Sequence, residues 1–374
     1  MHFVLLTAAL VFAGDTGMSP ERLARIPARM QSFVESGTAA GFVTLVARHG
    51  QLASLAAVGY QDRESKTPMR TDTIFQIMSM SKPITGVGIL ILADDGLLAL
   101  SDPVAKHLPE YRGKKFTIRD LMTHTSGMPG GSPEALAGPR GNWDHTLAEV
   151  VAIEAQMQLA GDPGLKWRYS NAGIATLGRI VEVISGQPFE KFMQGRIFTP
   201  LGMKDTHYFL PPEKGSRLAA VYTDDHGTLQ RSSADRFREG SKYAAPEGGI
   251  YSIATDLANF YQMMLNRGVL NGRRILSRAA VEVMTENHTG DIPSGFAPGM
   301  GYGLTWSVVR EPAGMFRLNS IGAYGHGGAY RTYGWIDPGK DMLGVILLQR
   351  TNNGGDVADE INAFMALAAA AIED

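Results

Sequence analysis

The N-terminal part of the chain carries first a helical and then a strand-like pattern of apolar positions. Ser19-Pro20 is typical of a helix start, and apolar residues recur at helical spacing from there toward Gly37. Two runs rich in apolar and β-branched residues follow, at 41–48 and 52–60. Because only a short His-Gly-Gln segment separates them, we expect two antiparallel strands joined by a tight turn.

The pattern changes twice in the rest of the chain. Helical signals dominate from Ser79 to about residue 242, and Thr117 to Asp120 is typical of a capping box at a helix start. After Pro246 the strand pattern returns in three stretches, which are 301–309, 329–336 and 342–349. An Ala-rich helix is expected at 356–372.

These elements predict an α/β fold of the α+β type. Strands at both ends pack most simply as one antiparallel sheet that is built from both termini and flanked by helices. The helical middle is then an inserted, mainly helical domain. We expect residues 19–78 and 243–374 to form the sheet-containing α/β domain, and residues 79–242 to form the insertion.

Residues 1–18 form a separate apolar segment. Its run from Phe3 to Ala13 is shorter than the roughly 20 residues that a membrane-spanning helix needs, so we expect no integral membrane segment. The small residues Val11 and Ala13 favour a secretory signal peptide and a periplasmic or secreted protein. No Lys or Arg precedes the run, which keeps a cytoplasmic protein as the alternative.

Composition excludes several function classes. The chain has 374 residues, and its 35 Lys and Arg against 37 Asp and Glu give a formal net charge of −2, so there is no basic excess for nucleic acid. With 44% hydrophobic residues it can bury a large core. The absence of Cys excludes disulfides, thiolate metal sites and a cysteine nucleophile. The nine His include no close pair with metal-ligand spacing, so no metal is expected.

The sequence Ser79-Met80-Ser81-Lys82-Pro83 is the densest chemical signal. A proline is tolerated only in the first turn of a helix, so Pro83 places Ser79 at or just before a helix start. Ser79 and Lys82 are three residues apart, which puts the ammonium within reach of the hydroxyl. Free amides at the helix start suit an oxyanion. The structural alternative is an N-cap serine followed by a solvated lysine.

Two further motifs follow, Tyr169-Ser170-Asn171 and Gly325-His326-Gly327-Gly328. With them the chain resembles the superfamily of serine β-lactamases and penicillin-binding proteins, over roughly residues 19–370. That superfamily carries S-x-x-K, Y-x-N and a K-T-G-type triplet in this order and at comparable spacings. The likeness is greatest to class C β-lactamases, D,D-peptidases and the β-lactamase-like (family VIII) carboxylesterases.

The single motifs also have structural interpretations. Tyr169 could be a buried phenol, Asn171 a helix cap and His326 a strand-edge residue. The run from His124 to Gly127 is interpreted as a helix end with a glycine C-cap rather than as a source of catalytic groups.

The resemblance implies a mechanism. Ser79 attacks the substrate carbonyl and forms an acyl-enzyme, while Lys82 favours the anionic forms of Ser79 and Tyr169. Tyr169 is then the general base for Ser79 and the general acid for the leaving group. No cofactor and no metal are needed, and the partner is a small-molecule ester or amide.

The remaining site residues are assigned by the same resemblance. Asn171 would orient Lys82 and bind the acyl side, and His326 would face the leaving-group side. Gly327-Gly328 would let the following strand, on which Ala329 is predicted to lie, approach closely. The oxyanion hole carries over as two backbone N–H groups, those of Ser79 and Ala329.

One departure bears on the substrate. His326-Gly327-Gly328 stands where the lactamases carry Lys-Thr-Gly, so the ammonium and the hydroxyl that help to hold a substrate carboxylate are missing. A carboxylesterase on short-chain esters is therefore the leading hypothesis. A class C-like β-lactamase or D,D-peptidase is the first alternative. An acyltransferase and a catalytically silent binding member of the fold are the others.

Overall fold

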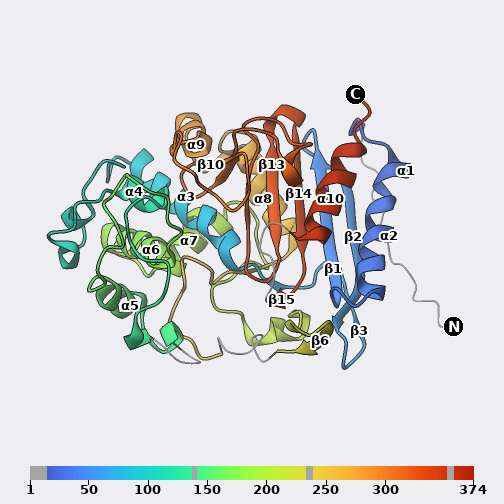
Figure 1. Cartoon of the computed structure of the whole chain (residues 1–374), viewed down its shortest axis with the longest axis horizontal. Helices are drawn as coiled ribbons and strands as arrows, with labels where there is room; N and C mark the ends of the chain where they lie inside the picture. The colour runs from blue at the N-terminus through green and yellow to red at the C-terminus, as the bar shows by residue number, and fades with distance from the viewer. Residues whose placement is uncertain (1–14, 137–140, 233–238, 352–357) are drawn as a thin grey trace.

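An eight-stranded antiparallel sheet forms the centre of the molecule, in the order β10-β11-β12-β13-β14-β1-β2-β3 (Figure 1). The structure is a computed structural model that describes residues 15–136, 141–232, 239–351 and 358–374. The strands are β1 (Gly41–Arg48), β2 (Gln51–Asp62), β3 (Thr67–Pro68), β10 (Met300–Tyr302), β11 (Ser307–Val309), β12 (Tyr324–Gly327), β13 (Tyr333–Asp337) and β14 (Met342–Leu347).

The sheet joins the two ends of the chain, as the sequence pattern predicted. β1 pairs with β2 on one side and with β14 on the other, so that Leu45 lies opposite both Leu55 and Val345. All eight residues of β1 are buried, because helices cover both faces of the sheet at this point. The expected hairpin of two N-terminal strands is confirmed.

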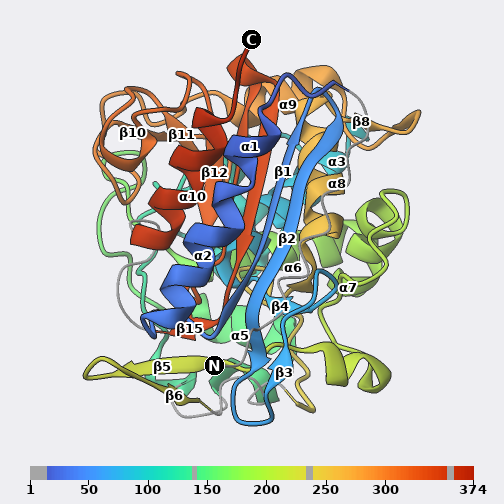
Figure 2. The ribbon, with the colours of Figure 1, turned by 90° about the vertical axis from the view of Figure 1, so that its right-hand side faces the viewer.

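Helices from opposite ends of the chain cover one face of the sheet. Figure 2 shows α1 (Pro20–Leu23), α2 (Arg25–Glu35) and α10 (Asp359–Ala370) side by side on this face. The predicted N-terminal helix is divided at Ala24. The first two residues of the predicted C-terminal helix, and the apolar run at 3–13, lie outside the described residues. Among the described helices, none combines the length and apolar character needed to cross a bilayer.

The opposite face of the sheet packs on α8 (Ala254–Leu265), which the strand pattern after Pro246 did not predict. Beyond it lies α3 (Ser81–Asp94), whose residues 81–92 are all buried. Further helices are α4 (Ile118–Met122), α5 (Leu147–Glu154), α6 (Asn171–Ser185), α7 (Phe189–Met193) and α9 (Arg278–Thr285). The capping box predicted at Thr117 is confirmed, because its side chain and that of Asp120 cap α4 reciprocally.

Short strands join the segments around the sheet. β4 (Phe75–Gln76) pairs with β7 (Tyr251–Ser252), and β5 (Tyr222–Asp225) pairs with β6 (Thr228–Arg231) and with β15 (Arg350–Thr351). A further hairpin consists of β8 (Val269–Leu270) and β9 (Arg273–Arg274). Hence β4 and β7 bring the chain just before α3 next to the chain that leads into α8.

Two strand predictions were wrong in detail. The stretch 301–309 is a hairpin, β10 and β11, rather than one strand. The strand predicted at 329–336 begins only at Tyr333, and Ala329 lies in the turn that precedes it. This turn is closed by the Gly328 N–H, which donates to the Thr332 carbonyl at 2.7 Å, and by Arg331 in a left-handed conformation with φ 64°. His326 and Gly327 consequently end a strand instead of preceding one.

Candidate active site

Ser79 lies in a 3₁₀ turn, Met78–Met80, that runs directly into α3. Pro83 is the third residue of this helix, in the first turn, where its missing N–H costs no hydrogen bond. Met80 rather than Ser79 is the N-cap, so the interpretation of Ser79 as a capping serine is wrong. The Ser79 side chain is half-buried at the junction of the turn and the helix.

Lys82 is fully buried and directed at Ser79. Its Nζ lies 2.9 Å from Ser79 Oγ and donates to the Glu247 carbonyl at 2.7 Å. Burial disfavours the charged form and lowers the pKa of Lys82 to about 7, although the Glu247 carboxylate opposes this shift. The alternative of a solvated lysine is therefore wrong, and near neutral pH a large fraction of the amine carries no charge.

Tyr169 completes the cluster of the three predicted catalytic side chains. Lys82 Nζ lies 4.7 Å from the centroid of the Tyr169 ring, over its face. The phenol ring is half-buried, and its centroid lies 6.2 Å from that of His326. The structure thus brings together side chains from three distant parts of the sequence: Ser79 and Lys82 at the start of α3, Tyr169 on the loop before α6, and His326 on β12.

His326 is buried and neutral. Its Nδ1 lies 2.7 Å from the Gly327 carbonyl, which can only accept, so Nδ1 carries the proton. Nε2 therefore accepts from the Tyr302 hydroxyl at 3.2 Å. Burial, and after it the charge of Lys82, lowers the pKa of His326 to about 3. The site consequently lacks a permanent cation at the position of the family lysine.

Gly328 permits a close contact between the β12–β13 turn and the segment before Ser79. A Cβ at this position would fall 2.4 Å from the Ile77 carbonyl oxygen and 2.2 Å from Thr332 Oγ1. Thr332 Oγ1 itself donates to the Ile77 carbonyl at 2.9 Å. Ala329 follows in the exposed part of the turn. Its N–H donates to none of the described residues, which leaves it available to a ligand.

Asn171 is not in the predicted hydrogen-bonded position beside Lys82, while its predicted binding of the acyl side stays a prediction. It is exposed at the first residue of α6, and the structure places no hydrogen bond between it and Lys82 among the described residues. The Glu247 carbonyl takes that position instead. The interpretation of Asn171 as a helix cap is also wrong, because the N-cap is Ser170, whose Oγ accepts from the Gly173 N–H.

Aromatic side chains surround Tyr169. The sequence motifs did not identify them. The ring of Phe296 lies 5.1 Å from that of Tyr169 and 5.3 Å from that of Trp167, centroid to centroid. The Trp167 ring is in turn 5.6 Å from that of Tyr302. Trp167 precedes Tyr169 by two residues, and in extended chain such residues share a side. That spacing is the signal that could have identified Trp167.

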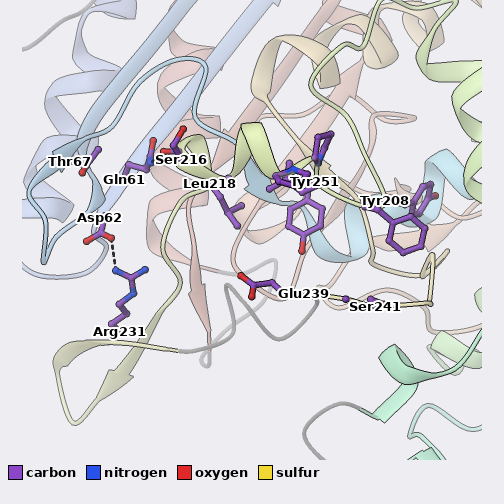
Figure 3. Close-up of a pocket in the computed structure, with 16 residues that line it drawn as sticks. Gln61, Asp62, Thr67, Tyr208, Ser216, Leu218, Arg231, Glu239, Ser241 and Tyr251 are labelled. Carbon is purple, nitrogen blue, oxygen red and sulfur yellow. Dashed lines mark hydrogen bonds and ion pairs between the residues drawn. The ribbon is translucent and has the colours of Figure 1, made fainter.

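A cavity of about 790 Å³ lies outside this cluster (Figure 3). Its wall combines side chains between Tyr208 and Leu218 with Gln61 and Asp62 at the end of β2 and Tyr251 on β7. Asp62 forms an ion pair with Arg231 at its edge. The cavity contains none of the candidate catalytic residues. Within the described parts of the chain, no group of three or more acidic or His side chains is placed to hold a metal ion.

Comparisons with known proteins agree with this geometry. The family model described as Beta-lactamase matches residues 26–369. Protein Rv1367c of Mycobacterium tuberculosis strain H37Rv is 30% identical, over 86% of this chain and 88% of that protein. Esterase EstB of Burkholderia gladioli is also 30% identical, over 88% of this chain and 90% of the esterase.

Solved structures share the fold. The structure of EstCE1, described as a hydrolase with promiscuous acyltransferase activity, superposes with a TM-score of 0.81 at 23% identity. The match covers 95% of this chain and 99% of that one. Because the family model spans almost the entire chain and the motif residues meet in one cluster, this chain belongs to the β-lactamase family, within the superfamily of serine β-lactamases and penicillin-binding proteins.

Proposed function

We propose that this protein is a serine carboxylesterase that hydrolyses short-chain esters through an acyl-enzyme on Ser79. The observation that carries the proposal is the neutral His326, where the lactamases hold a cationic lysine. A simple ester has no carboxylate, so the replacement of the lysine by a neutral histidine does not weaken its binding. The 30% identity to an esterase over most of both chains supports the same substrate class.

Acylation begins with the short contact between Lys82 and Ser79, so we assign to Lys82 the general-base role that the family resemblance gave to Tyr169. The neutral form of Lys82 has a lone pair within 2.9 Å of Ser79 Oγ and accepts its proton as the oxygen attacks the ester carbonyl carbon. The Glu247 carbonyl fixes the amine in this position through its own hydrogen bond. The backbone N–H groups of Ser79 and Ala329 bind the oxyanion that forms.

The leaving alkoxide needs a proton, and Tyr169 supplies it. The Lys82 amine lies 4.7 Å from the centroid of the Tyr169 ring, and in this scheme the proton taken from Ser79 passes through the amine and the phenol hydroxyl to the alkoxide. The ester C–O bond breaks, the alcohol departs, and the acyl group remains on Ser79. Water then attacks the acyl carbon and gives its proton to the same pair. The bond between the acyl carbon and Ser79 Oγ breaks, the pair returns the proton to Oγ, and the acid leaves.

β-Lactam opening and D-Ala-D-Ala cleavage are the second candidate, because they use the same acyl-enzyme. Their substrates present a carboxylate, and the neutral His326 does not supply the charged partner that the family lysine gives to that group. Transfer of the acyl group to an alcohol other than water would use the same intermediate.

The test is a panel of p-nitrophenyl esters with acyl chains from acetyl to hexanoyl. We expect wild-type turnover of the short esters, and only the background rate with Ser79→Ala. Lys82→Ala and Tyr169→Phe should each lower kcat by about 100-fold or more. Near-normal turnover by Ser79→Ala would refute the proposal, and near-normal turnover by Tyr169→Phe would refute its proton-transfer scheme.

A further inference from the structure

His124 occupies a backbone conformation that usually selects glycine. α4 ends in a Schellman motif, in which the Thr125 N–H donates to the Asp120 carbonyl at 2.9 Å and the His124 N–H to the Leu121 carbonyl at 3.2 Å. The residue after the C-cap is then left-handed, and His124 has φ 57°. The glycine C-cap was predicted at Gly127, which lies five residues beyond the last residue of α4, so that prediction was wrong. A side chain retained at a strained position is a reason to look for its role.

The contacts of His124 converge on Tyr169. The His124 carbonyl accepts from the Arg168 N–H at 2.7 Å, and His124 Nδ1 accepts from the Ser170 N–H at 3.2 Å. Both residues adjoining Tyr169 are therefore tied to His124. The imidazole also packs on the phenol, with the ring centroids 4.6 Å apart.

The imidazole acts here as a neutral acceptor. Because a backbone N–H donates to Nδ1, the ring proton must lie on Nε2. Burial, and after it the charge of Lys82, holds the pKa of His124 well below its usual value. The side chain is 1% exposed, so it does not touch substrate.

We propose that His124 is a positioning residue that holds Tyr169 in its catalytic place by fixing the chain on both sides of it and supporting its ring. This inference rests on the proposed function, since it assigns His124 an effect only through the Tyr169 phenol. The unfavourable backbone conformation fits this role, because only a side chain with an acceptor at the Nδ1 position satisfies the buried Ser170 N–H.

Two variants separate the acceptor from the ring. His124→Phe keeps a planar ring at the same positive φ but removes the acceptor. His124→Asn keeps an acceptor near the Nδ1 position, and Asn tolerates a positive φ. We expect His124→Phe to lower kcat on p-nitrophenyl butyrate by about tenfold or more with little change in KM, because small misplacements of a catalytic group are costly. His124→Asn should recover the larger part of this loss.

Turnover is expressed per active site that a fluorophosphonate labels, and melting temperatures are measured in parallel. A merely structural His124 would lower the melting temperature and the labelled fraction but leave kcat per labelled site unchanged, and that result would overturn the inference. If His124→Phe does not fold, His124→Gly replaces it, since glycine suits the conformation but offers neither acceptor nor ring. Equal kcat for the Gly and Asn variants would then overturn the inference.

A double variant tests whether His124 acts through Tyr169. In a Tyr169→Phe background, His124→Phe should cause little further loss of kcat, because the two residues act as a unit. A full additional loss would refute the positioning role while leaving the proposed function intact. Retained turnover in Tyr169→Phe alone would instead contradict the proton-transfer scheme of the proposed function.

Discussion

Lys82 Nζ lies 2.9 Å from Ser79 Oγ although the lysine side chain is completely buried. A buried ammonium is expensive unless its charge is satisfied, and the hydrogen bonds available here come from one hydroxyl and one backbone carbonyl. Burial lowers the pKa of Lys82 and the Glu247 carboxylate opposes this shift, which together bring the pKa to about 7. The nucleophile thus has a base beside it that changes its protonation state near neutral pH.

This pKa predicts the pH dependence of the reaction. Lys82 must be neutral to accept the Ser79 proton, so kcat/KM should rise as the pH increases through about 7 and level off above it. The profile is measured with p-nitrophenyl butyrate on both sides of neutrality. A rate that is flat across this range, or that falls with rising pH, would exclude neutral Lys82 as the base.

Glu247 should shift that profile. Its carboxylate favours the charged form of Lys82, so Glu247→Gln should lower the pKa of Lys82 and move the rising limb of kcat/KM to lower pH. The backbone carbonyl that holds the amine is unchanged by this substitution. Glu35→Gln, which removes one exposed carboxylate from α2 on the far face of the sheet, is the matched control and should leave the limb in place.

Covalent labelling should single out Ser79. A fluorophosphonate should add one label at this residue, as located by mass spectrometry of peptides, and Ser79→Ala should abolish it. Ser81→Ala is the control, because Ser81 is buried two residues away and its Oγ accepts from the Ile250 N–H instead of facing Lys82. A label that persists in Ser79→Ala would mean that another serine is the nucleophile.

The sequence predicts those parts of the fold and of the site that depend on contacts between residues close together in the chain. The β1–β2 hairpin follows from alternation and a short turn, and the proximity of Ser79 and Lys82 follows from Pro83 and helix geometry. The predicted bond from Asn171 to Lys82 failed because the acceptor, the Glu247 carbonyl, comes from 165 residues away. Such a partner has no local signal.

The turn after Gly328 and the role of His124 show the same limit. The aromatic run from residue 329 has the composition of a strand, but Gly328 and Thr332 pack on Ile77, and this long-range contact fixes a turn there. The left-handed position after α4 carries a histidine because its partners lie beside Tyr169. Neither arrangement can be derived from the flanking residues alone.

Gly328 should be indispensable for the reaction. An added methyl group would meet the Ile77 carbonyl at 2.4 Å, so Gly328→Ala must push the β12–β13 turn away from the segment before Ser79. Because this turn carries the Ala329 N–H, kcat should fall by about 100-fold, the usual scale for a lost oxyanion donor. The control is Gly131→Ala, where the added methyl group meets open space and φ is not positive. Equal kcat for the two variants would exclude this role of the turn.

The ion pair between Arg331 and Glu360 should anchor the same turn to α10. Its atoms are 2.6 Å apart, and the Glu360 side chain is 1% exposed. Glu360→Ala leaves a largely buried guanidinium without this partner and should lower the free energy of unfolding by about 3 kcal/mol in urea titrations. Glu282→Ala breaks an exposed pair with Arg278 and should have a far smaller effect. Comparable effects of the two would show that the buried pair is not an anchor.

Substrate preference is the sharpest consequence of a neutral His326. A charge-assisted hydrogen bond is worth about 1.5–3 kcal/mol, so a substrate carboxylate without its cation loses roughly tenfold to a hundredfold in kcat/KM. We therefore expect short-chain esters to be turned over readily, a chromogenic cephalosporin slowly, and a D-Ala-D-Ala peptide hardly at all. All rates are measured on one preparation, with Ser79→Ala as the blank. His326→Lys combined with Gly327→Thr restores the family triplet and should raise cephalosporin turnover relative to ester turnover. A wild-type kcat/KM for the cephalosporin above that for every ester would replace the esterase proposal with a β-lactamase.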